Sequence, residues 1–346
     1  MATTTSAPRI LSLPPEILAE IFTAYLPTYP VTADLKSSHS PFHLTHICRQ
    51  LADIATSTPT LWRAIRLCAP RESSAIMRSL QSDFEMLSTA FGRAGSCPLS
   101  IQLKGNPGLW IAGVIGAIFP YRTRWEYLSL DIDRSTLSSL VAPMPMLLGL
   151  HLSNWDFFPL CLSHIETPRL RSASIWYLHP SSPLPWSQLT HLQYREAPLS
   201  ECLTVLGQTP MLVWCKLWVT LDDVDEPDTA APVELRFLRA LLLITPNEDE
   251  DGDDPPCFVL RYLACPSLRT LRLNQLALSP SQLVYLQDFV ARSGCKIQDL
   301  MLFNGGPPGP ASKRITDAVR TSLAKAHVAN TSFIGEEDIP ELAWVA

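Results

Sequence analysis

The sequence predicts an α/β chain in which a short helical region precedes a solenoid with a concave parallel sheet. The main observation is a six-residue frame, apolar-x-x-apolar-x-apolar, which recurs at steps of 19 to 30 residues. Apolar residues two apart lie on one face of a strand, and a single strand cannot bury that face alone. Stacked copies bury it continuously, as in a solenoid. The second observation is an amphipathic helix ahead of the first copy.

The composition is that of a packed globular chain: 47% of the 346 residues are hydrophobic, 17% are charged, and the net charge is −6. These values exclude a disordered chain and give no global field that attracts nucleic acid or an anionic membrane. The N-terminus does not resemble a secretory signal, and the longest apolar run, Leu109 to Phe119, is too short to span a bilayer. We therefore expect a cytoplasmic or nuclear protein with neither membrane nor nucleic acid as a partner.

The nine cysteines are scattered along the chain, and none forms a CxxC pair. In an intracellular chain this usage is typical of reduced thiols. We therefore expect mostly buried, unpaired cysteines.

Residues 8–70 are predicted to form a small helical domain. In Pro15 to Tyr25 the apolar residues form one helical stripe, and Pro14 and Glu16 suit the start of a helix. A polar loop follows, and then a second helical stripe runs over Leu44 to Ala55.

Residues 71–96 are predicted to be a linking helix, because apolar residues from Ile76 to Phe91 share one face before a glycine-rich stop. The repeats are predicted over residues 97–310. A capping helix and tail are predicted over residues 311–346, since the end of a solenoid needs a polar-faced cap.

The copies of the frame share apolar residues at their first, fourth and sixth positions. Their last residues are Leu103, Leu130, Leu152, Ile175, Tyr194, Leu217, Leu243, Leu273 and Leu302. Several copies begin with proline and an apolar residue, which suits a turn that enters a strand.

The stretches LPPEILAEIF and LTHICRQLADIATSTPTLW resemble the F-box motif. The matching residues are Leu13, Pro14, Glu16, Ile17, Leu18, Ile21 and Phe22 in the first half, and Leu44, Ile47, Cys48, Arg49, Ile54, Ala55, Pro59, Leu61 and Trp62 in the second. Most of the steps between the frames match the period of leucine-rich repeats. An F-box followed by leucine-rich repeats is a familiar family arrangement.

This resemblance implies a non-catalytic subunit of a cullin-RING (SCF-type) ubiquitin ligase. The F-box would dock a Skp-type adaptor through the seven residues of the first half, and the repeats would hold a protein substrate. Such a subunit acts by effective concentration and orientation. Two alternatives stay open: an interaction scaffold without ubiquitin transfer, and a helix that only caps the solenoid.

The register of the frames also predicts which residues line the concave face. In three neighbouring copies these residues are Trp176, Arg195, Trp214, Lys216 and Trp218. Tryptophan and arginine dominate binding hot spots, so we expect substrate binding here. The alternative is that some of the tryptophan rings fold back over the edge of the solenoid and shield its core from solvent.

No motif predicts catalysis, a metal or a cofactor. His39, His43, His46 and Cys48 are possible zinc ligands by type, but no second pair follows at zinc spacing. There is no GxSxG, HExxH, GxGxxG or Gly-Lys phosphate loop. An enzyme with an unrecognised site is the remaining alternative. The acidic segments at 222–228 and 247–256 are expected to be solvated loops.

Overall fold

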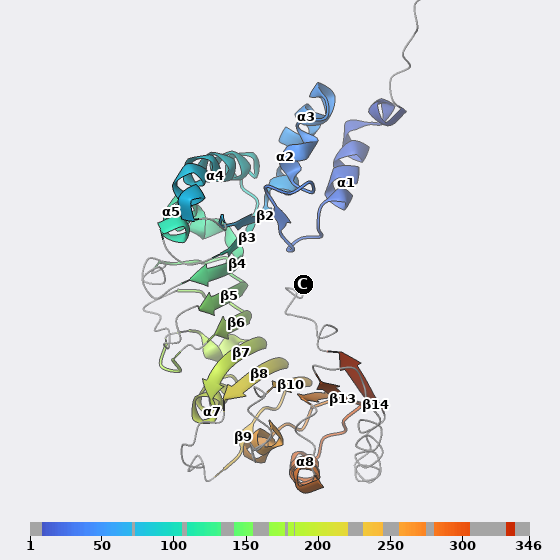
Figure 1. Cartoon of the computed structure of the whole chain (residues 1–346). Helices are drawn as coiled ribbons and strands as arrows, with labels where there is room; N and C mark the ends of the chain where they lie inside the picture. Colours follow the sequence, from blue (N-terminus) through green and yellow to red (C-terminus); the bar gives the residue numbers. More distant parts are fainter. Residues whose placement is uncertain are drawn as a thin grey trace, which may run out of the picture. The chain divides into compact units, whose positions relative to one another are not determined.

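The computed structural model describes residues 9–70, 73–105, 109–132, 142–154, 166–176, 179–182, 184–220, 231–244, 256–274, 280–304 and 330–335. The chain divides into two compact units. Unit 1 comprises Met1–Asp156, His164–Arg169 and Trp344–Ala346, and unit 2 comprises Phe157–Ser163 and Leu170–Ala343. Both units are α/β, and most of their α-helices and strands are labelled in Figure 1.

Unit 1 begins with helices and continues as strands that alternate with helices. Its helices are η1 (Arg9–Ser12), α1 (Pro15–Tyr25), α2 (Pro41–Leu44), α3 (Arg49–Thr56), η2 (Pro59–Trp62), α4 (Ser73–Arg93), α5 (Leu109–Ile118) and η3 (Phe119–Arg124). Its strands are β1 (Ala33–Asp34), β2 (Ala64–Cys68), β3 (Leu99–Lys104), β4 (Trp125–Ile132) and β5 (Gly149–Asn154). These strands pair in parallel in chain order.

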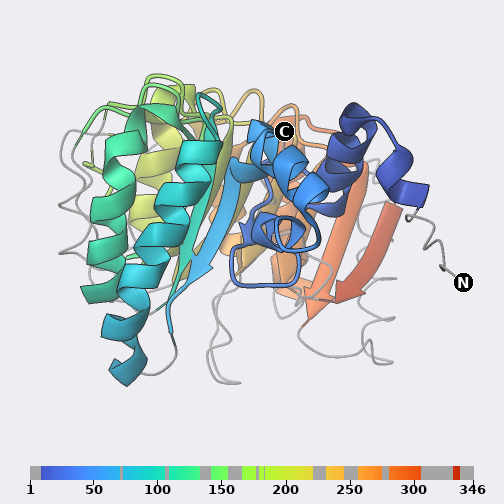
Figure 2. The same cartoon turned by 90° about the horizontal axis from the view of Figure 1, so that it is seen from above.

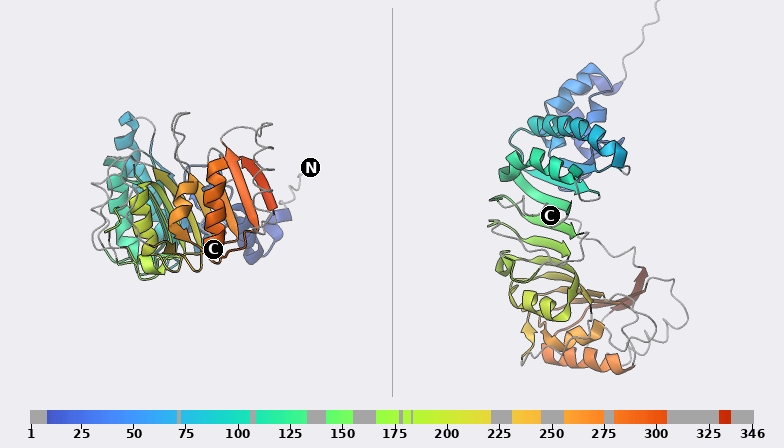
Figure 3. Two further views of the ribbon diagram at one scale, coloured as in Figure 1. Left: turned by 90° about the horizontal axis from the view of Figure 1, so that it is seen from below. Right: turned by 60° about the vertical axis from the view of Figure 1, so that its left-hand side comes forward.

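Unit 2 repeats the same plan. Its sheet consists of β6 (Ser172–Trp176), β7 (His191–Pro198), β8 (Trp214–Thr220), β10 (Ala240–Ile244), β12 (Thr270–Asn274), β13 (Asp299–Asn304) and β14 (Asn330–Gly335). A small parallel pair joins β9 (Val233–Glu234) to β11 (Leu263–Ala264). The helices are η5 (Trp186–Gln188), α7 (Leu199–Gly207), η6 (Pro256–Tyr262) and α8 (Pro280–Ser293). Figure 3 shows α7 and α8 on the same side of the strands.

All nine predicted frames are strands of these parallel sheets. Their apolar positions meet in register, as when Leu128 and Leu130 pair with Leu150 and Leu152. These four side chains are at most 2% exposed. The prediction of an α/β chain with a large parallel sheet is therefore confirmed, because the alternation that defines the frame also defines the buried face.

The sheet is longer than predicted at both ends. The polar loop after α1 supplies β1, and β2 follows η2 after a single residue, Arg63. Residues 8–70 therefore contribute two strands rather than a separate helical domain, and the sheet begins before residue 97. At the other end, β14 is a strand within the predicted cap and tail. The predicted capping helix lies outside the described residues.

The second predicted helix is wrong as a single element. It divides into α2 and α3, because Ser40 caps an earlier helix by accepting from the Phe42 amide and Cys48 is extended (φ −160°, ψ 164°). Ile47 in the intervening turn is 63% exposed. The helix α4 lies within residues 71–96, where the sequence predicts a linking helix, and it is followed by Gly95, whose φ of 57° suits glycine.

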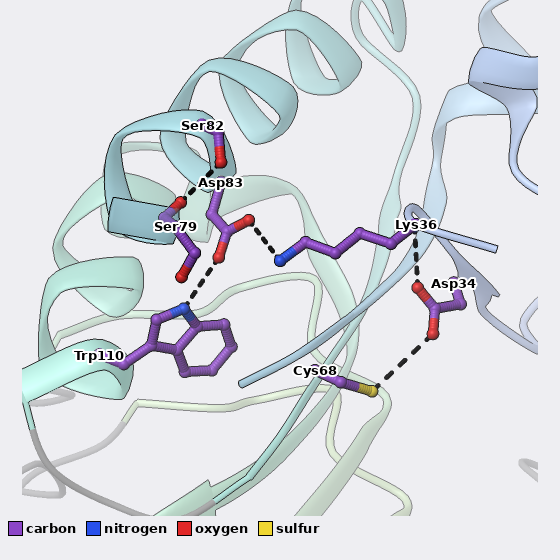
Figure 4. Close-up of polar contacts among 7 residues, drawn as sticks. All are labelled: Asp34, Lys36, Cys68, Ser79, Ser82, Asp83 and Trp110. Atoms are coloured by element: carbon purple, nitrogen blue, oxygen red, sulfur yellow. Dashed lines mark hydrogen bonds and ion pairs between the residues drawn. The ribbon is translucent and has the colours of Figure 1, made fainter. Parts of the chain in front are cut away.

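Figure 2 shows α4 and α5 on one side of strands β2 to β4, and α1, α2 and α3 on the other side. A buried carboxylate connects the two groups (Figure 4). Asp83 on α4 is fully buried, and its Oδ2 accepts a hydrogen bond of 2.9 Å from Trp110 Nε1 on α5. Its Oδ1 lies 2.7 Å from Lys36 Nζ in an ion pair that lacks hydrogen-bond alignment.

The turn after β1 directs Lys36 toward this carboxylate. Asp34 Oδ1 accepts the backbone N–H of Lys36 at 2.9 Å, which is an Asx-type turn. The side chain of Lys36 is 40% exposed, so its ammonium reaches from solvent to a carboxylate that has no solvent contact. Asp83 therefore joins the loop between α1 and α2 to both α4 and α5.

We predict that Asp83→Ala lowers the stability of unit 1 by about 3–5 kcal/mol, because it removes one member of a buried charged pair and leaves the indole N–H without its acceptor. The matched control is Glu85→Ala on the exposed side of the same helix, which should change stability by less than about 0.5 kcal/mol. Urea denaturation followed by circular dichroism measures both. Equal midpoints for the two variants would contradict this role of Asp83.

Candidate functional site

The helix α1 divides its apolar residues between its own core and its surface. Pro15 occupies the first turn and Glu16 complements its positive end. Leu18 is fully buried and Phe22 is 4% exposed, because they pack toward α3 and η2. These two predicted adaptor-binding residues are therefore core residues that are not available on the surface.

The remaining predicted residues of α1 lie outward. Ile17 and Ile21 are 42% and 40% exposed, Leu13 is 37% exposed, and Pro14 and Glu16 are exposed. Sequence periodicity could not separate Ile17 from Leu18, since adjacent positions fall within one broad stripe.

Two further apolar side chains, which the sequence analysis did not select, extend this outward face. Ile10 in η1 is 46% exposed and Tyr25 at the end of α1 is 44% exposed. We call Ile10, Leu13, Ile17, Ile21 and Tyr25 the α1 face. Ile17, Ile21 and Tyr25 follow one another at four-residue steps on α1, and such a row of large exposed apolar residues is typical of a surface that binds a partner.

An aromatic cluster around Trp62 of η2 packs against the helices α1, α2 and α3. Trp62 is fully buried, donates its indole N–H to the Ala55 carbonyl at 2.8 Å, and meets Phe42 edge to face at 5.0 Å. The guanidinium of Arg93, at the end of α4, lies 4.4 Å from the centre of a Trp62 ring. Burial lowers the pKa of Arg93. The platform that holds α1 is therefore also attached to α4.

The loop between α1 and α2 covers part of the polar face of unit 1. Ser100 Oγ donates to the Pro30 carbonyl at 2.6 Å, and Thr32 Oγ1 donates to Gln102 Oε1 at 3.0 Å. Tyr29 donates to a carboxylate oxygen of Glu126, and burial together with this carboxylate raises the Tyr29 pKa. The face of β3 and β4 near this loop is thus occupied by the chain itself.

The five predicted substrate-binding residues share one face of unit 2. Each alternates with buried core residues, such as Cys215 and Leu217 of β8, and so points away from the core. The five are Trp176 on β6, Arg195 on β7, and Trp214, Lys216 and Trp218 on β8. Because β6, β7 and β8 are neighbours, the structure brings the five together.

Arg195 is the centre of this group. Its guanidinium carbon lies 5.1 Å from the Trp176 ring centre and 5.8 Å from the Trp218 ring centre. Oriented with its oxygen toward Arg195, the Gln193 amide accepts from the Nε and Nη2 atoms of the guanidinium. A β-bulge after Tyr194 interrupts the pairing of β7 with β8, and Glu196 in this bulge has a φ of 54°. Two indoles and one amide therefore hold the Arg195 guanidinium in place.

Lys216 differs from the expectation of an open cation, because it is only 5% exposed. Its register partner is Leu242, and Leu242 and Ile244 are 3% and 6% exposed although they alternate with the core residues of β10. Trp218 packs against these two residues. The six-residue frame could not predict the burial of Leu242 and Ile244, because it places every residue between core positions on a solvated face.

The sequence analysis also did not identify a row of polar side chains on β4 and β5 of unit 1. Asp131 accepts the Gly105 N–H at 3.0 Å and a hydrogen bond from Ser153, and Ser153 Oγ lies 3.1 Å from His151 Nε2. Burial raises the pKa of Asp131. A nucleophile needs a histidine between serine and carboxylate, whereas serine is central here, so the row does not have the order of a catalytic triad.

The described part of the chain contains no group of three His, Cys, Asp or Glu side chains that could hold a metal ion. None of its helices is long and apolar enough to cross a membrane. Seven of the cysteines in the described residues are free, and four of these seven are buried. Burial raises the pKa of Cys265 to about 12, which keeps it in the inert thiol form.

The chain matches no model of a known protein family, and no curated protein is significantly similar to it. The resemblance to F-box proteins with leucine-rich repeats therefore stays a prediction from the residues that carry it. The acidic segments at 222–228 and 247–256 lie almost entirely outside the described residues.

We predict that adjacent residues of α1 respond very differently to truncation. Leu18→Ala should lower stability by about 2–5 kcal/mol, because it leaves a cavity in the core. Ile17→Ala should change stability by less than about 0.5 kcal/mol, because its side chain is on the surface. Thermal unfolding by circular dichroism distinguishes them, and a reversed order would show that α1 is rotated relative to this structure.

Proposed function

We propose that this chain is the substrate-recognition subunit of a cullin-RING ubiquitin ligase, with α1 docking a Skp-type adaptor. The observation that carries the proposal is the α1 face, held outward by the burial of Leu18 and Phe22. A helix that offers one apolar face to a partner groove is a recurring mode of protein recognition. The proposed contacts are made by Leu13, Ile17 and Ile21, with Pro14 and Glu16 beside them.

The packing beneath α1 suits this function. A substrate receptor accelerates ubiquitin transfer by holding its substrate in a fixed orientation. A flexible junction beside the docking helix would weaken that effect. In unit 1 the junction is held by β1 in the sheet, by Arg93 over Trp62, and by the buried Asp83. These contacts connect the proposed docking helix to the first strands.

Substrate binding is assigned to the face of unit 2 that carries Trp176, Arg195 and Trp218. Large rings around a fixed guanidinium provide the buried contact area and the specificity that hot spots require. The α1 face and this substrate face lie on different units, so substitutions can separate the two functions.

We predict that Ile17→Glu combined with Ile21→Glu abolishes co-purification of a Skp-type adaptor, because two carboxylates cannot be buried in an apolar groove. Both side chains are exposed, so the variant should retain its circular dichroism spectrum. The matched control is Val284→Glu, at a 52% exposed position on α8, which should keep the adaptor.

Adaptor binding that survives the double substitution would contradict the docking role of α1. Adaptor binding without ubiquitin transfer would identify the chain instead as an interaction scaffold. The measurement is the level of co-purified partner proteins in cells with and without a cullin inhibitor, since substrates of a ligase should accumulate when the cullin is blocked.

A further inference from the structure

Three neighbouring copies in unit 2 enter their strands through the same turn, and the turns precede β8, β10 and β12, which are adjacent in the sheet. The buried leucine that ends each turn donates its backbone N–H to the carbonyl three residues earlier: Leu212 to Thr209 at 3.2 Å, Leu238 to Leu235 at 3.3 Å, and Leu268 to Cys265 at 3.2 Å. The residues before and after these leucines therefore form two rows along the amino-terminal edge of the strands.

The row that follows the leucines contains two adjacent arginines. Arg269 donates its backbone N–H to the Arg239 carbonyl at 2.9 Å, and Arg239 donates its own to the Val213 carbonyl at 2.8 Å. These bonds hold the backbones of the two arginines on neighbouring strands, about 4.8 Å apart. Both arginine side chains are exposed, and within the part of the chain that the structure describes neither side chain has a hydrogen-bond or ion-pair partner. Because two like charges this close repel each other, an anion between them is stabilised by both.

The row that precedes the leucines contains two large apolar side chains. Met211 is 47% exposed and Phe237 is 50% exposed, and they occupy equivalent positions in the turns before β8 and β10. The equivalent residue is Gln188 before β7 and Ser267 before β12, so the apolar pair is confined to two adjacent copies. Phenylalanine, methionine and arginine are among the residues enriched in protein interfaces.

The charge of this edge is opposite to that of the whole chain, which is −6. Lys296, exposed in the turn before β13, adds a third cation to the two arginines. The nearby carboxylates are already engaged: that of Glu234 lies 3.0 Å from Arg236 Nη2 in an ion pair, and Asp299 at the start of β13 is only partly exposed and has a partner. Among the described residues, the edge therefore has an excess of positive charge beside an apolar pair, and it is complementary to an acidic ligand.

The mixed chemistry of the two rows favours a peptide over a nucleic acid. A nucleic acid is held mainly by cations along several successive phosphates, whereas half of this surface is apolar. An extended peptide places alternate side chains on opposite sides, so a segment that lies between the two rows presents one kind of side chain to each row.

We propose that this edge of unit 2 binds an acidic segment of a partner protein in which carboxylates alternate with apolar side chains. The carboxylates pair with Arg239 and Arg269, and the apolar side chains pack on Met211 and Phe237. We call these four residues the strand-entry patch. The patch shares no residue with the proposed substrate face and needs neither an adaptor nor ubiquitin transfer, so its failure would leave the proposed function untouched.

The experiment uses the full chain and a fluorescein-labelled peptide in which glutamate alternates with leucine, followed by fluorescence anisotropy. We expect half-saturation at about 100 μM or below. One control peptide has glutamine in place of glutamate and another has glycine in place of leucine. Each should bind at least about fivefold more weakly, because each lacks one of the two kinds of contact.

Two results with these probes would overturn the proposal. The first is the absence of peptide binding up to about 1 mM. The second is tighter binding of a fluorescein-labelled oligothymidylate than of the peptide, because the edge would then be a nucleic-acid site.

Substitutions locate the binding on the strand-entry patch. Arg239→Gln combined with Arg269→Gln should weaken peptide binding at least about tenfold, and Phe237→Ala at least about threefold. The matched control is Arg272→Gln, three residues further along the same chain segment within β12, which should leave binding unchanged. Equal binding by the double variant and by Arg272→Gln would contradict the assignment.

A reversal of charge covers the case in which a substitution disturbs folding. Arg239→Glu combined with Arg269→Glu should bind a peptide in which lysine alternates with leucine, and the wild type should not. A misfolded chain would lose binding instead of exchanging one peptide for the other, and a variant that fails to make the exchange would count against the patch. A wild-type dimer that becomes monomeric in the Arg239→Gln, Arg269→Gln variant would also overturn the proposal, because a second copy would then occupy the patch.

Discussion

The arrangement of unit 1 depends on the neutralisation of one buried carboxylate. Asp83 has no solvent contact, and a charge in that position is stable only with partners. Trp110 supplies a hydrogen bond and Lys36 supplies the opposite charge, and the three residues come from three different segments. If the helical region rotated away from the first strands, Lys36 would leave and the buried carboxylate would lose its opposite charge. The single interaction therefore couples the position of α1 to the sheet.

The strands were predictable because their side chains repeat a local rule. Every frame places apolar residues two apart, and burial along a parallel sheet requires that pattern in each strand independently. The face that carries Trp176 and Arg195 follows from the same rule, since the residues between core positions must point the other way. The rule could not predict the environment on that face, where the register partners Lys216 and Leu242 are both buried.

The unpredicted features all depend on contacts between distant residues. Nothing local marks Asp83 as buried, although it lies four residues before the buried Leu87 on the same stripe of α4. The choice between Leu18 and Ile17 as the inward residue depends on where α3 lies. The strand β1 forms from a polar loop because β2 offers it a free edge. Such outcomes follow from tertiary packing and have no periodic signal in the sequence.

The short strand β1 has a further consequence for the edge of the sheet. An uncovered edge of a parallel sheet can recruit a strand from another molecule. Here β1 pairs with only two residues of β2, and the Leu35 amide adds a hydrogen bond to the Arg66 carbonyl. The turn at Ser37 and the helices beyond it then leave the edge. The loop that packs beneath α1 thus also ends this edge of the sheet, and it leaves only a short strand edge with which another molecule could pair.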